Sequence, residues 1–346
     1  MSKIQSDDSA KCFSIGRLST SLPNGLILAF SNQVIQQSTL LLDVLPMVQT
    51  EDCFALHGGT ALNFFILDMP RLSVDIDLTY CPIEPFGQTT HHINQALTRI
   101  AKKIQSAYPD VRIQKKYKSS KLNIRRKNAT IKIEPNKLMR GVIEKPKMFS
   151  LSPKTSQFFN KQVSMPVVPQ AQIIGGKFCA ALSRKLVRDL FDVQQILNEI
   201  PLAPSIKEGF FYALLSNRNR IVDNFFISIE HRQNPTRSEI DGLMETPLTE
   251  QAYQKTFQYL LDQMHEWLTL EDKTFLMEFQ KGIDDFRDYH WLRFPSVERK
   301  LKHLRILKSK NPVEYEKQLQ LLEGVLYDTD VPQKSLLYGL DRPYET

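Results

Sequence analysis

Two aspartates that alternate with apolar residues are the side chains best placed to do chemistry in this chain. They lie in the run Val74-Asp75-Ile76-Asp77-Leu78. Side chains on a strand alternate between faces, so the two carboxylates point together while the three apolar residues point into the core. Adjacent carboxylates repel each other and are costly to desolvate unless a divalent cation lies between them. The pattern therefore favours a strand that holds such a cation.

A glycine pair followed by a hydroxyl residue lies shortly before this strand. Gly58, Gly59 and Thr60 open an apolar stretch with helical spacing, which Pro70 ends. The free N–H groups at a helix start bind phosphate. Taken alone, the glycines suit a tight turn and the acids suit an exposed strand face. In this order, however, they match the layout of polymerase-β-type nucleotidyltransferases, and they predict bound Mg²⁺, or Mn²⁺, together with a nucleoside triphosphate (NTP).

A third carboxylate lies in another alternating run, from Thr130 to Glu134. Glu134 shares a strand face with Lys132, while Ile131 and Ile133 face the core. From a neighbouring strand, this glutamate would complete a metal site or accept a proton from an attacking hydroxyl. A solvated glutamate paired with Lys132 is an equally good interpretation.

A helical segment in the middle of the chain combines cations with paired acids. On one helix, Lys177, Arg184 and Arg188 fall at spacings of seven and four residues, which places their charges on one side. A lysine on a helix neutralises triphosphate charge as a compact cation. Asp189 and Asp192 are three residues apart and share a face of a following helix. Alone, the segment is typical of a basic amphipathic surface helix.

Together, these segments resemble the AbiEii family of nucleotidyltransferase-like toxins, the toxic half of type IV toxin–antitoxin and abortive-infection pairs. The family motif G-G-T-A-L, followed by R-x-S-x-D-I-D-L, is matched by Gly58–Leu62 and Arg71–Leu78. A later motif, K-x-x-A-[LA]-x-x-R-x-x-x-R-D-x-[YF]-D, is matched by Lys177–Asp192. The resemblance covers residues 50–200 and implies transfer of a nucleotide from an NTP to RNA, in particular to the 3′ end of tRNA, which blocks translation. It also implies a cognate antitoxin.

The same resemblance implies a role for each site residue. Asp75 and Asp77 are implied as metal ligands. Contacts to nucleotide phosphates are implied for the glycine turn, one serine and one lysine: Gly58, Gly59, Thr60, Ser73 and Lys177. Asp192 is implied to activate the acceptor or to orient the site, Glu134 matches as an alternative catalytic carboxylate, and Arg188 with Asp189 is implied as a structural ion pair. Two alternatives stay open: transfer of a nucleotidyl or phosphoryl group to a protein or small molecule, and NTP sensing without catalysis.

A run of basic residues without an intervening acid lies in the predicted meander, between residues 112 and 127. It consists of Arg112, Lys115, Lys116, Lys118, Lys121, Arg125, Arg126 and Lys127. On adjacent strands these residues form a positive surface that suits an RNA backbone, and lysine protection of an edge strand is the competing interpretation. A second basic run at residues 299–310 is interpreted as the solvated face of a late helix.

The remaining patterns predict an α+β protein with a mixed sheet flanked by helices, followed by a helical half. Period-two runs predict an antiparallel meander over residues 111–134 and a further strand near 162–168. Helical stripes occupy residues 172–187, 189–199, 206–217, 249–268, 271–285 and 296–323. We therefore expect a nucleotidyltransferase core at 1–170, with an irregular arm before residue 30. A helical domain at 171–346 would complete the site and end in a loose tail.

Composition limits the class of protein. The chain has 346 residues, 42% of them hydrophobic and 24% charged, with a formal charge of +7 that modestly favours an acidic partner. Its four cysteines form no C-x-x-C pair, so neither a zinc site nor a disulfide framework is expected. The polar, acidic start does not resemble a secretory signal, and no apolar run approaches a membrane span. These features predict a cytoplasmic protein.

Overall fold

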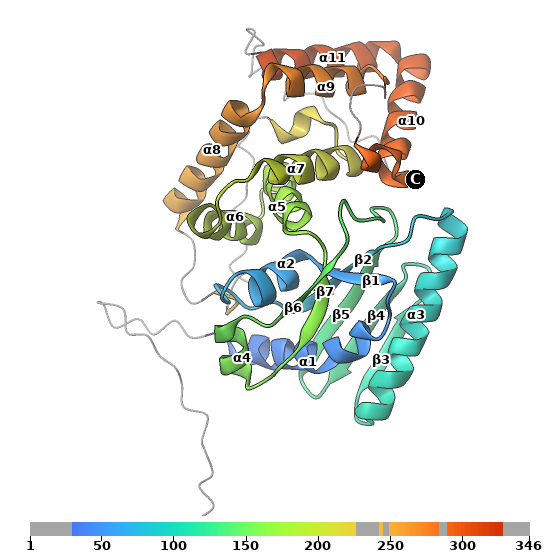
Figure 1. Cartoon of the computed structure of the whole chain (residues 1–346), viewed down its shortest axis with the longest axis vertical. Coiled ribbons are helices and arrows are strands. Elements are labelled where there is room, and N and C mark those ends of the chain that lie inside the picture. The colour runs from blue at the N-terminus through green and yellow to red at the C-terminus, as the bar shows by residue number, and fades with distance from the viewer. Residues whose placement is uncertain (1–29, 226–241, 245–248, 284–288, 328–346) are drawn as a thin grey trace, which may run out of the picture.

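The computed structural model of the chain describes residues 30–225, 242–244, 249–283 and 289–327. A mixed sheet with its own helices forms one part of the molecule, and the helices from α5 onward gather on the other side (Figure 1). This arrangement confirms the α+β prediction. The predicted N-terminal arm and C-terminal tail fall largely outside the described residues, and the division into two domains at residue 170 stays a prediction.

Seven strands form one sheet in the order β3-β4-β5-β2-β1-β7-β6. Their bounds are β1 Phe54–His57, β2 Asp75–Tyr80, β3 Arg112–Lys116, β4 Lys121–Arg126, β5 Ala129–Asn136, β6 Lys147–Ser150 and β7 Ser164–Val167. Strands β3, β4 and β5 form the predicted antiparallel meander, and β5 then pairs in parallel with β2. The sequence pattern missed β6, which pairs antiparallel with β7 at the sheet edge.

The helices follow the predicted stripes, with differences at their ends. The helices that pack with the sheet are α1 Asn32–Gln49, α2 Gly58–Ala61, α3 Phe86–Ala107 and α4 Pro153–Phe159, and a π-helical turn at Leu62–Ile66 continues α2. The others are α5 Gln170–Arg184, α6 Val187–Glu199, α7 Pro204–Ser216, α8 Glu250–Trp267, α9 Leu270–Gln280, α10 Pro295–Lys310 and α11 Pro312–Tyr327, with 3₁₀ turns at Val222–Asn224 and His290–Arg293. The stripe at 296–323 is two helices, because Asn311 precedes a proline and leaves the helical conformation.

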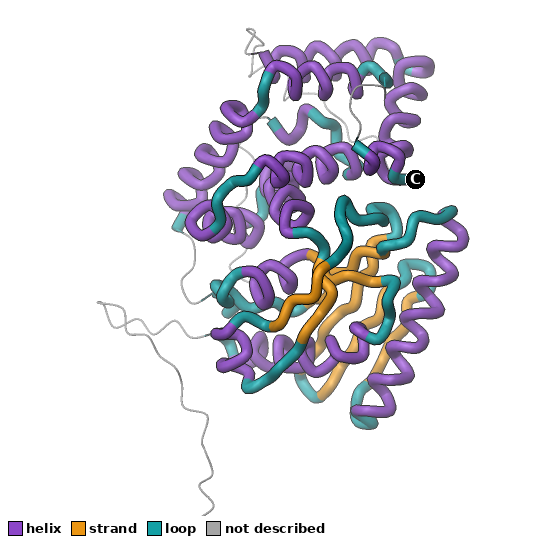
Figure 2. Tube along the Cα trace, in the orientation of Figure 1, coloured by secondary structure: helices purple, strands orange, loops and turns teal. Residues whose placement is uncertain are grey.

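The alternating pattern gives the sheet one apolar and one polar face. Ile76, Ile124, Ile131 and Ile133 are buried on one face. Helices α1 and α3 pack against the strands (Figure 2). The neighbours of these isoleucines in sequence point the other way. We call this second surface, which bears Asp75, the polar face.

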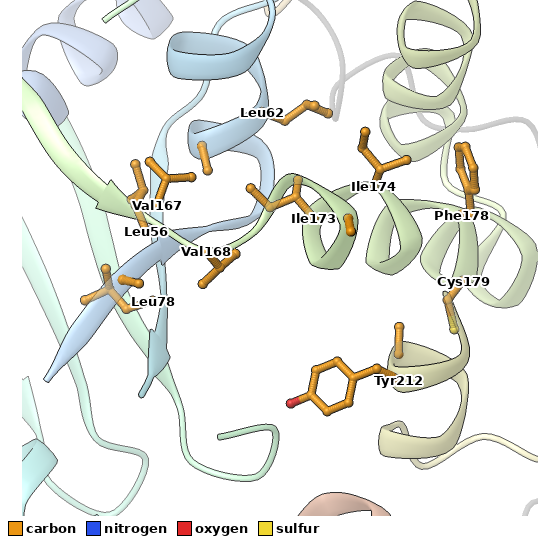
Figure 3. Packing of buried hydrophobic residues seen from close by; sticks show 14 of the residues in the cluster. Leu56, Leu62, Leu78, Val167, Val168, Ile173, Ile174, Phe178, Cys179 and Tyr212 are labelled. Atoms are coloured by element: carbon orange, nitrogen blue, oxygen red, sulfur yellow. The ribbon is translucent and has the colours of Figure 1, made fainter. Parts of the chain in front are cut away.

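The apolar core continues from the strands into the helices beyond residue 170. Figure 3 shows Leu56 and Val167 of the sheet near Ile173 of α5, with Tyr212 of α7 beyond. Helices α5 and α7 approach closely because each has a glycine at the contact: a Cβ on Gly175 would lie 2.1 Å from a backbone nitrogen of α7. This packing holds α5 and α7 together. Among the described residues, no helix has the length and apolar character needed to cross a membrane.

Candidate active site

The paired aspartates lie on β2 as predicted, with their carboxylates on the polar face. Ile76 and Leu78 between and after them are buried, whereas Asp75 and Asp77 are partly exposed. Asp77 lies opposite His57 of β1 in the antiparallel register. On its other side it lies level with Glu134 of β5 in the parallel register.

The electrostatics of this pair favour a bound cation. Burial is the main cause that raises the pKa of Asp77 to about 6; Lys177 opposes the shift, and the charges of Asp75 and Glu134 add to it. Burial also raises the pKa of Asp75, although Lys132 beside it acts in the opposite direction. Each carboxylate therefore lies in buried surroundings that disfavour its ionised form. Two carboxylates of this kind are hard oxygen donors, which fit Mg²⁺ or Mn²⁺.

The glycine turn lies directly against one of the aspartates. Gly58 has a φ of 70°, the left-handed region that favours glycine. A Cβ at this position would lie 2.3 Å from Asp77 Oδ2. The absence of a side chain therefore lets the backbone of the turn and the carboxylate occupy adjacent space.

The hydroxyl groups predicted to touch phosphate have partners within the protein. Thr60 Oγ1 donates to the carbonyl oxygen of Asp75 at 2.6 Å and hydrogen-bonds to Ser73 Oγ at 2.8 Å. Both side chains are buried. These contacts fasten α2 to β2, so the geometry gives no support to phosphate contacts from the two hydroxyls.

Asp192 joins the sheet part to the helical part through a buried ion-pair network. Its carboxylate accepts from Arg71 Nε at 2.7 Å and Arg71 Nη2 at 2.8 Å, and it lies 2.7 Å from Lys177 Nζ. Asn63 Nδ2 donates to the same group at 3.2 Å. The side chain of Asp192 is 0% exposed.

These partners decide the protonation of Asp192. Burial alone would raise the pKa of this carboxyl, but the charges and hydrogen bonds of Arg71 and Lys177 hold it well below its usual range. A buried carboxylate whose two oxygens are both occupied cannot receive an acceptor hydroxyl. The geometry does not fit proton transfer to Asp192, and it fits the alternative that Asp192 orients the site.

The prediction that Lys177, Arg184 and Arg188 share one helix is wrong for Arg188. Helix α5 ends at Arg184, because Lys185 adopts a left-handed conformation with φ of 54°, and Arg188 therefore lies on α6. Lys177 remains near the site, with its side chain 11% exposed. Asp189 lies 3.5 Å from Lys177 and 3.0 Å from Arg184, so its ion pairs differ from the predicted pair with Arg188.

Glu134 does not form a three-carboxylate metal site with the two aspartates. Its carboxylate lies 2.9 Å from Lys121 Nζ. In the part of the chain that the structure describes, no group of three or more His, Cys, Asp or Glu side chains is arranged to hold a metal ion. The aspartate pair of β2 is thus the candidate ligand set, and Glu134 lies beside it.

Comparisons with known proteins agree with this geometry. The model of the nucleotidyl transferase AbiEii toxin family, from type IV toxin–antitoxin systems, matches residues 39–290, more than two thirds of the chain. The chain belongs to the AbiEii family. It is therefore a nucleotidyltransferase enzyme. No curated protein matches the chain.

Two solved structures resemble this AbiEii protein. MenT4, a nucleotidyltransferase toxin from Mycobacterium tuberculosis, is 16% identical with a TM-score of 0.55, over 79% of this chain and 92% of that chain. The likeness shows that the two share a fold. Terminal uridylyl transferase 4 from Trypanosoma brucei, with bound GTP, is 12% identical with a TM-score of 0.29, over 85% of this chain and 93% of that chain.

Three residues of the AbiEii site had no role assigned from the sequence. Arg71 and Asn63 hold Asp192, and His57 lies across from Asp77. Burial, with the nearby charge of Lys177, lowers the pKa of His57 to about 4, so this histidine is neutral at pH 7. Arg71 stands inside the first family motif, a position that could have marked it as the partner of a buried acid.

Half of the predicted basic run lies on the polar face beside the aspartates. The pairing of β3 with β4 places Arg112 beside Arg125, and Lys116 beside Lys121. The registers of β3 with β4, of β4 with β5 and of β5 with β2 place these four residues on the same face as the aspartates. Arg126 lies on the opposite face, where it pairs with Asp110 at 2.9 Å.

Proposed function

We propose that this AbiEii protein transfers a nucleotide from an NTP to a hydroxyl of RNA, with the 3′ end of tRNA as the acceptor and Mg²⁺ as the cofactor. The observation that carries the proposal is the pair Asp75 and Asp77, held partly buried against the glycine turn and opposite Lys177. Within the described residues, neither carboxylate forms a salt bridge, although Lys132 and Lys177 lie near enough to influence their pKa values. A metal-bound triphosphate would supply the positive charge that the two carboxylates lack.

The aspartates of β2 would hold the metal, and the rest of the site would hold the substrate. When bound, the ion would polarise the α-phosphate of the NTP. Lys177, fixed by Asp192, balances negative charge on the departing pyrophosphate. In this proposal the backbone N–H groups at the start of α2 hold phosphate, and Gly58 lets this turn lie directly against Asp77, whose Oδ2 occupies the space where a Cβ would be. Arg71 and Asp192 do not touch substrate in this proposal, since they hold Lys177 and α2 in place.

The chemical step is an attack by the acceptor hydroxyl on the α-phosphorus. A new oxygen–phosphorus bond forms, the bond to the β-phosphate breaks, and pyrophosphate leaves with the bonding electrons. Glu134 is the partly exposed carboxylate beside Asp77, and it takes the proton of the hydroxyl. Asp192 has no part in this transfer.

The polar face supports RNA as the acceptor. Arg112, Lys116, Lys121 and Arg125 extend away from the aspartates across two strands. A phosphate backbone laid on these strands would direct a strand end toward Asp75 and Asp77. Toxins of type IV systems act with an antitoxin, so we propose that a cognate antitoxin controls this activity, and that the reaction takes place in the cytoplasm, where tRNA is charged.

Separate incubations with each α-³²P-labelled NTP test the acceptor. Each reaction contains Mg²⁺ and one acceptor class: total tRNA, a protein extract freed of nucleic acid, or a small-molecule extract. Label on the 3′ end of tRNA supports the proposal. Label confined to a protein or a small molecule contradicts the RNA acceptor, and nucleotide binding without any labelled product would favour NTP sensing.

A further inference from the structure

A second concave site lies in the helical part, away from the aspartates. It is a pocket of about 250 Å³ between the segment that follows α7 and the helix α10, with single residues from α9 and α11. Figure 1 shows α9, α10 and α11 on the side of the molecule away from the sheet. No residue assigned to the candidate active site lines this pocket.

The pocket is strongly basic. Its lining includes Arg218, Arg220, Arg299, Lys300 and His303, and none of the described lining residues is acidic. The basic run at 299–310 was interpreted from the sequence as a solvated helix face, and this is wrong for its first residues, since Lys300 is buried. Cations gathered in a hollow repel each other, so such a group needs either internal partners or a bound anion.

Two of these cations have internal partners and form part of the wall. Lys300 Nζ donates to the carbonyl oxygen of Leu214, in the last turn of α7, at 2.8 Å and to that of Asn219, in the segment after α7, at 2.7 Å. Arg220 Nη2 lies 2.6 Å from Asp223 Oδ1. These contacts hold the segment after α7 in place and leave the remaining donors facing the pocket.

The other donors lack partners. Gln280 is 3% exposed, and its Nε2 is buried without a hydrogen bond in the described part of the chain. Arg299 Nε is also buried without a hydrogen-bond partner in the described part of the chain. Burial, together with the nearby charge of Arg218, lowers the pKa of Arg299. The exposed Arg218 has no ion pair among the described residues. A buried donor without an acceptor is costly, so these groups mark a place for an acceptor that the protein does not supply.

We propose that this pocket binds a small phosphorylated anion of about the size of pyrophosphate. Guanidinium and amide N–H groups that converge from different helices match the several oxygens of a phosphate group. A compact anion fits a pocket of about 250 Å³ whose lining includes Gln280 and Arg299, whereas a nucleic-acid backbone contacts side chains that stand out from the surface. The inference rests on the pocket residues alone and does not depend on the proposed transfer reaction.

Isothermal titration calorimetry of the full chain with pyrophosphate, and separately with inorganic phosphate, tests the proposal. The buffer contains EDTA, so that metal-dependent binding at the aspartates does not contribute. Arg218→Ala removes an exposed cation of the pocket and is not expected to affect folding. Gln280→Leu removes the buried amide at similar volume. Lys302→Ala is the matched control. It removes one exposed cation from α10, a helix that contributes to the pocket, but Lys302 itself does not line the pocket.

We expect pyrophosphate to bind the wild type and Lys302→Ala equally, and to bind Arg218→Ala and Gln280→Leu at least about tenfold more weakly. Three results would overturn the proposal. The first is no binding to the wild type. The second is binding that both pocket variants leave unchanged, which would place the anion elsewhere. The third is an RNA oligonucleotide that binds the wild type more tightly than pyrophosphate does and that loses this binding in Arg218→Ala.

Discussion

Replacement of Asp192 by asparagine should destabilise the whole protein, because this carboxylate holds charges from both parts of the molecule. The change keeps the volume but removes the negative charge, and it leaves Arg71 buried without its ion pair and Lys177 with only Asp189, at 3.5 Å. The loss of one partner from a buried ion pair typically costs about 3–5 kcal/mol. Asp192 is 0% exposed, so water does not screen this cost.

This free energy converts into a measurable change in Tm. Unfolding entropy is about 2 cal/mol/K per residue, so for a chain of this length the loss corresponds to a decrease in Tm of roughly 4–7 °C. Differential scanning calorimetry at pH 7.5 measures it. Asp110→Asn is the matched control, since it makes the same change in an arginine–aspartate pair on the surface, and its Tm should equal that of the wild type.

The effect should also depend on pH in a defined direction. The folded protein holds the pKa of Asp192 below its ordinary value of 3.8. The stabilisation is therefore fully present above that value and is lost as the pH falls below it, where the unfolded chain binds a proton that the folded chain does not. The gap in Tm between wild type and Asp192→Asn should narrow on acidification below about pH 4. A gap under about 1 °C at pH 7.5 would refute the assigned network.

Three further predictions test the aspartate pair, the glycine turn and the polar face. Asp77→Asn, assayed by thermal unfolding in EDTA, should have a Tm at or above that of the wild type, because it removes repulsion from Asp75; a clear decrease would show that Asp77 is a structural residue. Gly58→Ala should reduce transfer at least about tenfold, because its Cβ would lie 2.3 Å from Asp77 Oδ2, and undiminished transfer would contradict the packed turn. Arg112→Ala combined with Lys116→Ala should raise the KM for RNA and reduce the salt slope of RNA binding by about two, and a change confined to the KM for NTP would exclude the polar face as the RNA surface.

Local sequence patterns predicted the parts of the fold that local forces determine. The alternation around Asp75 and Asp77 placed both side chains on one strand face, and the meander at 111–134 was evident from the same period of two. The order of the strands in the sheet could not be predicted from these patterns. Pairing of β2 with β5 depends on packing between distant segments, and nothing in either strand records which neighbour it will have.

The network around Asp192 was beyond the reach of local patterns for two reasons. Arg71 and Asp192 are 121 residues apart, so only the folded chain brings them together. The break between α5 and α6 comes from Lys185, a lysine in a left-handed conformation that glycine or asparagine normally adopts. The stripes at 172–187 and 189–199 predicted two helices, but the spacing of Lys177, Arg184 and Arg188 placed Arg188 with the first, whereas it lies on α6.

The aspartate pair is tested most directly by transfer of label from α-³²P NTP to tRNA by wild type, Asp75→Asn and Asp77→Asn over a range of Mg²⁺ concentrations. We expect label on the tRNA 3′ end with wild type in the presence of Mg²⁺, none in EDTA, and a loss of at least about a hundredfold in each folded variant. Transfer by either folded variant at the wild-type rate would contradict the claim that these two carboxylates hold the catalytic metal.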